Sequence, residues 1–169
     1  NYYFVGTGTG TGMPKAMLIG ATSSSITTAS ATAVTAAEIL QLIYTMPSAY
    51  ADSMALVMQR STLGKIRALT GNPFSFISTP AGNGTATADG DIHGIPVFTT
   101  DAMPASTAGL LSVLLINPSF YGIAEREGLT VSRNPYLYQL SGQIGLFAKS
   151  RVGGNILQAE AAYYITQHA

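Results

Sequence analysis

The sequence predicts an α+β fold, in which helices and strands follow one another without a regular alternation. A helix-start motif at Thr35 to Glu38 is followed by apolar residues at helical spacing. Two short, continuous apolar runs, Met54 to Met58 and Leu110 to Ile116, are typical of strands that are covered on both faces. No internal repeat is present.

The first predicted helix begins after Thr35, whose hydroxyl and the Glu38 carboxylate satisfy each other's backbone donors. Pro47 ends it. The residues expected on its buried stripe are Ala36, Ile39, Leu40 and Ile43.

The second predicted helix is capped by Ser61 or Thr62 and ends at Gly71, which suits a left-handed cap. Its inward residues are expected to be Leu63, Ile66 and Leu69.

The strands are expected at several places along the chain. Leu110 to Ile116 is the best candidate for a central strand, and Gly94 to Thr100 lies near a sheet edge because it starts at a proline. Residues 15–21 are predicted to be extended, and residues 21–35 to be a loop or a weak edge strand. The later strands are expected at Leu129 to Arg133, Gln143 to Val152 (with Ile144, Leu146, Ala148 and Ser150 on one face) and Ala162 to Thr166.

The composition points to a surface that is buried against other subunits. Only 9% of the 169 residues are charged, against about 25% in an ordinary soluble domain. Eight basic and eight acidic residues give a formal net charge of zero, which argues against free-standing nucleic-acid binding. The chain has no cysteine, which excludes disulfides and thiolate chemistry. The sequence predicts no cofactor and no metal.

The glycine run Gly6 to Gly12 raises the alternative of a nucleotide-binding enzyme. Lys15 is followed by Ala16, so the Ser or Thr of a phosphate loop is missing. The dinucleotide-binding pattern G-x-G-x-x-G can start at Gly6 or at Gly8. It fails in both cases, because its third glycine is replaced by Thr11 or by Met13. Pro14 favours an extended segment before it. The preferred interpretation is a tight surface turn.

Catalytic and metal-binding patterns are weak. His93 precedes a predicted strand and is interpreted as structural or surface-exposed. A cation site built from Asp89, Asp91 and Asp101 lacks the spacing of a calcium loop, so a solvated loop is preferred. The chain is not predicted to be an enzyme.

Six charged residues in the last third of the chain are the candidate assembly contacts. Ordinary cross-strand pairing and pairing between subunits both remain open for them. They are Glu125, Arg126, Glu127, Arg133, Lys149 and Arg151. The turn at Pro104 to Ser106 and the loop from Asn72 to Asp91 are further contact candidates.

Five segments of the chain carry a recognisable set of motifs. They read "GTGTGTGMPKAMLIGA", "VMQRSTLGKIRAL", "IHGIPVFTTDAMPA", "FYGIAEREGLTVSRNPY" and "GQIGLFAKSRVGGNILQAEAAYYI". Together they resemble the motifs of the major capsid proteins of tailed bacteriophages with the Hong Kong 97-like fold, in that family's order and over nearly the whole chain.

The resemblance implies a fold and a domain division. A central mixed sheet flanked by helices forms the axial domain, residues 1–119, to which the chain returns at 153–169. Residues 120–152 contribute strands of a partial peripheral domain. The match starts after the family's spine helix, which implies a C-terminal portion without the N-arm and E-loop. Such a piece is expected to be a monomer or a small ring.

The resemblance also implies a function. The chain is expected to be a self-assembling subunit of the icosahedral shell of a tailed phage or prophage, located in the virion and, during assembly, in the host cytoplasm. Its expected partners are copies of itself in pentamers and hexamers, packaged DNA bound without sequence preference, and scaffolding and portal proteins. The alternative is an encapsulin-type compartment. The cross-linking chemistry of some members is not carried over, because Ser141 to Gln143 lacks the acceptor Asn.

Overall fold

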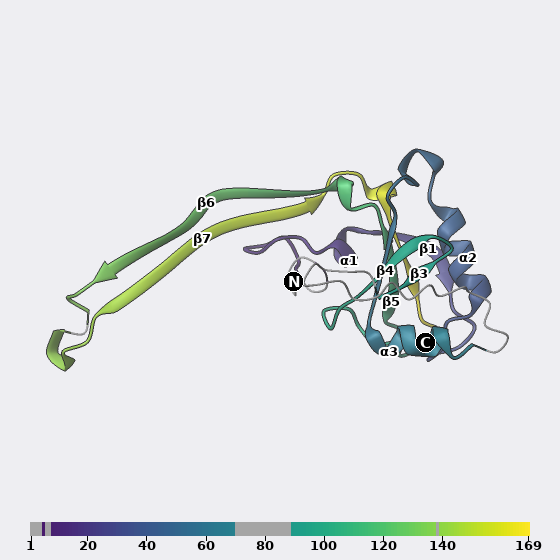
Figure 1. Ribbon diagram of the computed structural model, residues 1–169, viewed down its shortest axis with the longest axis horizontal. Helices are drawn as coiled ribbons and strands as arrows, with labels where there is room; N and C mark the ends of the chain where they lie inside the picture. Colours follow the sequence, from purple (N-terminus) through teal and green to yellow (C-terminus); the bar gives the residue numbers. More distant parts are fainter. Residues whose placement is uncertain (1–4, 6–7, 70–88, 138) are drawn as a thin grey trace.

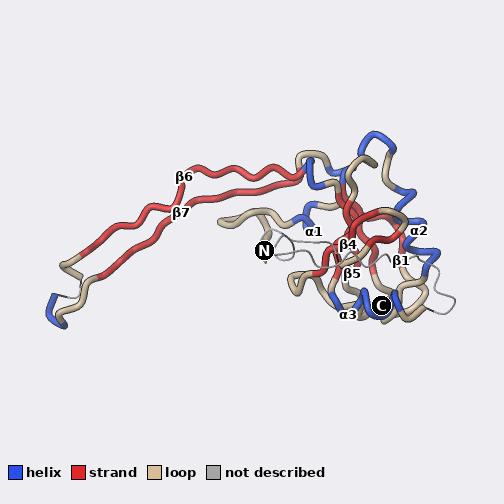
Figure 2. Tube along the Cα trace, in the orientation of Figure 1, coloured by secondary structure: helices blue, strands red, loops and turns tan. Residues whose placement is uncertain are grey.

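The computed structural model describes residues 5, 8–69, 89–137 and 139–169. Figure 1 shows two parts: a body of sheet and helices, and a long two-stranded arm that projects from it. The same division is visible in Figure 2, where the strands of the arm run well beyond every loop of the body. The α+β prediction is confirmed.

The body is built on a six-stranded mixed sheet. The parallel pairs are β1 with β8 and β2 with β4, and the other neighbours are antiparallel. In spatial order the strands are β1 (Thr22–Thr27), β8 (Ala162–Thr166), β5 (Leu111–Ile116), β2 (Ala55–Met58), β4 (Ile95–Thr99) and β3 (Asp91–Ile92).

Strand β5 lies in the interior of the sheet and is covered on both faces. Leu115 packs in one apolar cluster with α2 and α3, and Leu114 packs in a second cluster with Leu18 and Tyr121. Both leucines are fully buried. The apolar run is continuous because both faces of β5 are buried, as expected. The prediction of a central strand is confirmed.

The edges of the sheet also agree with the sequence. Only the two-residue strand β3 lies outside β4, so the proline-led strand is near an edge as predicted. Strand β1 is the other edge, and its register shifts between Ser23 and Thr27 around Ser25, whose φ is 60°. A segment of small hydroxyl residues thus forms an irregular edge strand.

Helix α2 (Ala36–Thr45) carries the predicted capping box. Thr35 Oγ1 accepts a hydrogen bond from the Glu38 backbone at 3.4 Å, and Glu38 Oε2 accepts one from Thr35 N at 2.7 Å. Glu38 Oε1 also accepts from Ala29 N at 2.8 Å, which ties the incoming loop to the helix. Ile39 and Leu42 are buried against the sheet. The helix ends before Pro47.

Helix α3 (Arg60–Arg67) begins earlier than predicted. Its N-cap is Gln59, whereas Ser61 and Thr62 lie inside the first turn. Ser61 Oγ donates to Gln59 Oε1 at 2.7 Å, and so it does not cap the helix. Leu63 and Ile66 are buried as expected, with Leu69 packed beside them. The helix ends at Arg67 with Ala68 as its C-cap, so the predicted end at Gly71, itself outside the described residues, is wrong.

The prediction of an extended segment over residues 15–21 is wrong in its second half. Met17–Gly20 form one helical turn, α1, closed by hydrogen bonds from Gly20 N to Ala16 O and from Ala21 N to Met17 O, at 2.9 and 3.0 Å. The turn buries Leu18 in the second apolar cluster. Burial of this one side chain favours the helical turn over an extended course.

The arm consists of β6 (Tyr121–Asn134) and β7 (Gly145–Ile156), paired antiparallel. Their register shifts between Glu125 and Glu127, and again between Glu127 and Thr130. Among the described residues, no helix is long and apolar enough to span a membrane.

Candidate assembly surface

The strand register gives the arm one apolar face. Residues that pair directly across the strands lie on the same face, and one set of such pairs is mainly apolar. The large side chains of this set are exposed to solvent: Ile123 is 64% exposed, Val131 61% and Leu146 71%. Beside them lie Ala148 and Val152. An apolar stripe of this kind on an exposed ribbon is typical of a protein interface.

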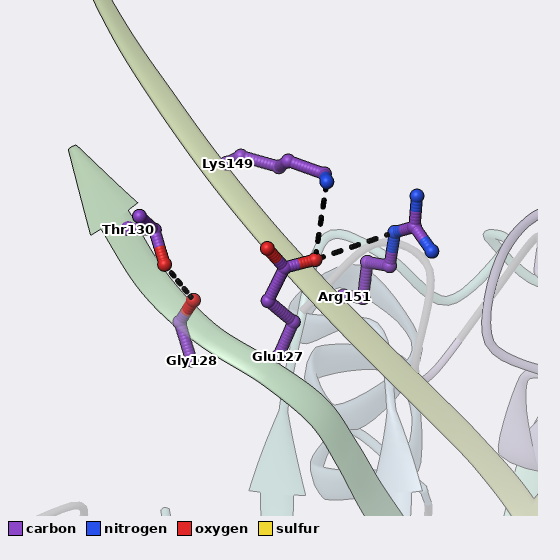
Figure 3. Close-up of polar contacts among 5 residues, drawn as sticks. All are labelled: Glu127, Gly128, Thr130, Lys149 and Arg151. Atoms are coloured by element: carbon purple, nitrogen blue, oxygen red, sulfur yellow. Dashed lines mark hydrogen bonds and ion pairs between the residues drawn. The ribbon is translucent and has the colours of Figure 1, made fainter. Parts of the chain in front are cut away.

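The opposite face of the arm is polar and carries its own ion pairs. Glu127 Oε2 lies 3.3 Å from Lys149 Nζ and 3.5 Å from Arg151 Nε (Figure 3). Thr130 pairs with Lys149 in the register, and Thr130 Oγ1 donates to Gly128 O at the bulge. The two faces therefore differ in character, with Phe147, 45% exposed, as a large apolar side chain on the polar face.

The six predicted contact residues divide into two groups. Glu127, Lys149 and Arg151 meet in one cluster within the arm, which is cross-strand pairing. Glu125, Arg126 and Arg133 form no ion pair with any other described residue. In the register, Glu125 pairs with Val152 and Arg133 with Leu146, so these two charges lie on the same face as the apolar stripe and interrupt it.

The other two predicted contact loops fare differently. Ser106 is buried, and its hydroxyl donates to Thr32 O at 2.9 Å and accepts from Lys65 Nζ at 2.8 Å. Lys65 also donates to Thr32 O at 2.8 Å. The hydroxyl of Ser106 is therefore engaged within the body, whereas Pro104 and Ala105 of the same turn are partly exposed, so a contact at this turn stays a prediction. Most of the Asn72 to Asp91 loop lies outside the described residues.

The glycine run forms a turn, and its described part does not resemble a phosphate cradle. Thr9 and Lys15 form an antiparallel bridge, and Gly10 and Gly12 between them have φ of 87° and 71°, which favours glycine. Lys15 N donates to Gly154 O at 2.8 Å, and Ala16 N donates to Gly8 O at 2.7 Å. Both backbone donors are thus already used within the protein.

Tyr121, at the base of the arm, was missed by the sequence analysis. Its hydroxyl donates to Lys15 O at 2.7 Å, across 106 positions of sequence. Burial raises the pKa of this hydroxyl above its ordinary value. The only signal for this contact was an aromatic residue beside the charged segment.

No catalytic constellation stands out. Among the residues described, no three His, Asp or Glu side chains are placed to hold a metal ion. Asp89 accepts hydrogen bonds from the backbone and hydroxyl of Thr99, which gives it a local structural role. A groove of about 560 Å³ lies between the glycine turn and the arm, bounded by Met13, Pro14 and Arg151 among others.

The comparison with protein families matches residues 1–166 to the phage capsid family. The chain belongs to this family. No curated protein matches the sequence. Among solved structures, this family member is similar to the capsid of an empty GTA particle, at 22% identity and a TM-score of 0.78, over 99% of this chain and 60% of that one. It therefore spans 60% of the length of that capsid protein.

Two further structures share the capsid fold. The first is from Mycobacterium phage Patience, with 16% identity and a TM-score of 0.58 over 85% of this chain and 45% of that one. The second is an encapsulin complex from Synechococcus elongatus, with 14% identity and a TM-score of 0.61 over 90% of this chain and 56% of that one. These likenesses confirm the predicted Hong Kong 97-like fold.

Proposed function

We propose that the chain is a structural subunit of the icosahedral shell of a tailed phage or prophage. The single observation that supports this most directly is the arm, a 14-residue and a 12-residue strand that project together from the body. A two-stranded ribbon is at best marginally stable alone in water. An exposed ribbon with an apolar stripe is suited to being covered when the protein assembles.

The charges support contacts between copies. Residues 121–156 contain four basic and two acidic side chains, whereas the rest of the chain contains four basic and six acidic ones. An arm of net positive charge complements a body of net negative charge on a neighbouring copy. Such a contact joins different surfaces of the two copies, and repeated contacts of this kind close into rings.

The domain division follows from the same proposal. Residues 1–119 and 153–169 form the axial domain, which meets other copies around five-fold and six-fold centres. Residues 120–152 form the peripheral part, and Glu125, Arg126 and Arg133 contact neighbouring subunits. In the arm, Glu127 pairs with Lys149 and Arg151, and these three residues also contact the neighbouring subunit.

The wider setting is proposed on family membership. The shell would enclose DNA without reading its sequence, work with scaffolding and portal proteins, assemble in the host cytoplasm and end in the virion. A structural role, rather than catalysis, is supported by the glycine turn, whose Lys15 and Ala16 donors are engaged within the protein.

The direct experiment is electron cryomicroscopy of particles isolated from cells that produce the complete gene product. The proposal expects closed icosahedral particles in which this fold repeats. Nuclease treatment and analysis of the contents then separate two cases. Packaged DNA supports a phage shell, whereas enclosed protein without DNA supports the encapsulin alternative. A product that remains monomeric and binds a nucleotide tightly contradicts both.

A further inference from the structure

We propose that the glycine turn, residues 8–16, acts as a brace that fixes the direction in which the arm leaves the body. The brace is defined as the turn together with its two hydrogen bonds to the arm. Its importance for shell curvature rests on the proposed function, but the brace itself is a property of a single chain.

The arm needs such a support because its contacts with the body lie at its base, next to the ends of β6 and β7. The chain enters β6 through the short turn η3 (Pro118–Phe120) and leaves β7 through η5 (Ala159–Ala161). Two backbone hydrogen bonds close this junction, from Leu157 N to Phe120 O at 2.8 Å and from Asn117 N to Ala161 O at 2.9 Å, and the Tyr50 ring packs edge-on against Phe120. Because the arm is joined to the body only at one end, through η3 and η5, these two connections alone would let it bend relative to the body, out of the plane of its two strands.

Lys15 joins the brace to both strands of the arm. Its N–H donates to Gly154 O of β7 at 2.8 Å, and its C=O accepts from the Tyr121 hydroxyl of β6 at 2.7 Å. Both bonds use the backbone of one residue. The Tyr121 bond holds β6 at its first residue, next to the chain crossing, and the Gly154 bond holds β7 two residues before its end.

The brace is itself fixed to the body. Ala16 is fully buried, and the helical turn α1 follows it directly. Leu18 packs in one apolar cluster with Tyr121 and Ile156. Gly20 lies against Ile156, so closely that a Cβ at this position would stand 3.0 Å from Ile156 Cδ1. The brace thus connects the buried apolar cluster around Leu18 to the arm.

The glycines give the brace its shape. Gly10 and Gly12 have positive φ, which reverses the chain so that Gly8 O accepts from Ala16 N at 2.7 Å. Figure 1 shows this segment running alongside the base of the arm. This role accounts for a glycine run that fits no phosphate-binding pattern.

The test uses the absence of cysteine in the chain. Spin labels on Gln41→Cys in α2 and Ser132→Cys in the arm report the direction of the arm by pulsed electron spin resonance. A second pair, Gln41→Cys with Asp52→Cys, lies within the body and reports whether the body stays folded. Both distances and their distributions are measured on the full chain in its unassembled state.

Two variants remove the contacts of the brace one at a time. Lys15→Pro deletes the N–H that reaches Gly154, and Tyr121→Phe deletes the hydroxyl that reaches Lys15. The matched control is Lys15→Ala, which keeps the backbone bonds and loses only the side chain. We expect the arm-to-body distribution to broaden and shift in Lys15→Pro and Tyr121→Phe, most in the double variant, and to stay unchanged in Lys15→Ala.

A second control separates turn geometry from general backbone strain. Gly12 and Gly142 both have positive φ, 71° and 68°, and open space where a Cβ would lie. Gly12→Val should broaden the distribution, and Gly142→Val, at the far end of the arm, should not. The proposal is overturned if the double variant keeps the parent distribution while the body pair is unchanged. This readout is independent of whether particles form, so its failure is distinct from a failure of the proposed function.

Discussion

Glu127 and Lys149 form an ion pair across the two strands of the arm, with 3.3 Å between carboxylate and ammonium. The side chain of Lys149 is 57% exposed, and that of Glu127 is 35% exposed. Arg151 shares the same carboxylate oxygen. Charges that are this well solvated contribute little to stability, because water and salt screen them.

Replacing Glu127 by Gln should change the free energy of unfolding by less than about 1 kcal/mol, because the pairs are exposed. The effect should shrink further in high salt. Chemical denaturation at low and high salt measures it, with Arg133→Gln as the control that removes a charge without an ion pair in the described structure. A loss of several kcal/mol would contradict the interpretation of Glu127 as a solvated pair.

Leu115→Ala should destabilise the body strongly. Leu115 is fully buried in the central strand, and loss of such a side chain costs about 2 to 5 kcal/mol. Leu146→Ala, on the exposed face of the arm, should stay within about 0.5 kcal/mol of the parent in the unassembled protein. Urea denaturation of both variants checks the contrast. Equal losses would mean that the arm is packed in the free chain.

The capping box of α2 should be worth a measurable share of stability. Thr35→Ala should cost about 1 kcal/mol, and Glu38→Ala about 2 kcal/mol, because Glu38 also holds Ala29 N. Gln41→Ala on the exposed side of the same helix is the control. If Glu38→Ala were no worse than Gln41→Ala in thermal denaturation, the capping assignment would be wrong.

The raised pKa of Tyr121 predicts a pH dependence at alkaline pH. The folded state keeps the proton on the hydroxyl at a pH where the unfolded state, with a pKa of 10.0, has lost it. The contribution of Tyr121 to the free energy of unfolding is therefore fully present below the unfolded-state pKa. It is lost as the pH rises from there through the higher pKa of the folded state. The free energy of unfolding, measured from pH 8 to 11, should fall less steeply in Tyr121→Phe. Parallel profiles would show that Tyr121 does not contribute.

Local signals in the sequence predicted the body well. The capping box at Thr35 and Glu38 and the apolar run of β5 each have a cause within a few residues. The start of α3 was misplaced by two or three residues: its N-cap is Gln59, and Ser61 bonds to the Gln59 side chain rather than to the helix backbone.

Contacts between distant segments were not predictable in this way. The bond from Tyr121 to Lys15 joins residues 106 positions apart, and Leu18 of α1 packs in one apolar cluster with Tyr121 and Ile156, which are more than 100 positions away. For the charged residues, the sequence left pairing within the arm and pairing between subunits open. The ion pairs of Glu127 with Lys149 and Arg151 show pairing within the arm for these three residues, and their contacts with a neighbouring subunit stay a proposal. Glu125, Arg126 and Arg133, which form no ion pair among the described residues, stay proposed interface residues.

The central claim is that the exposed apolar stripe of the arm is covered when this subunit assembles. The most direct measurement is a cryomicroscopy map of the particles formed by the complete gene product, at a resolution that shows side chains. The account predicts closed shells in which Ile123, Val131 and Leu146 lie against other protein. Shells in which this stripe faces open solvent, or a product that never leaves the monomeric state, would contradict it.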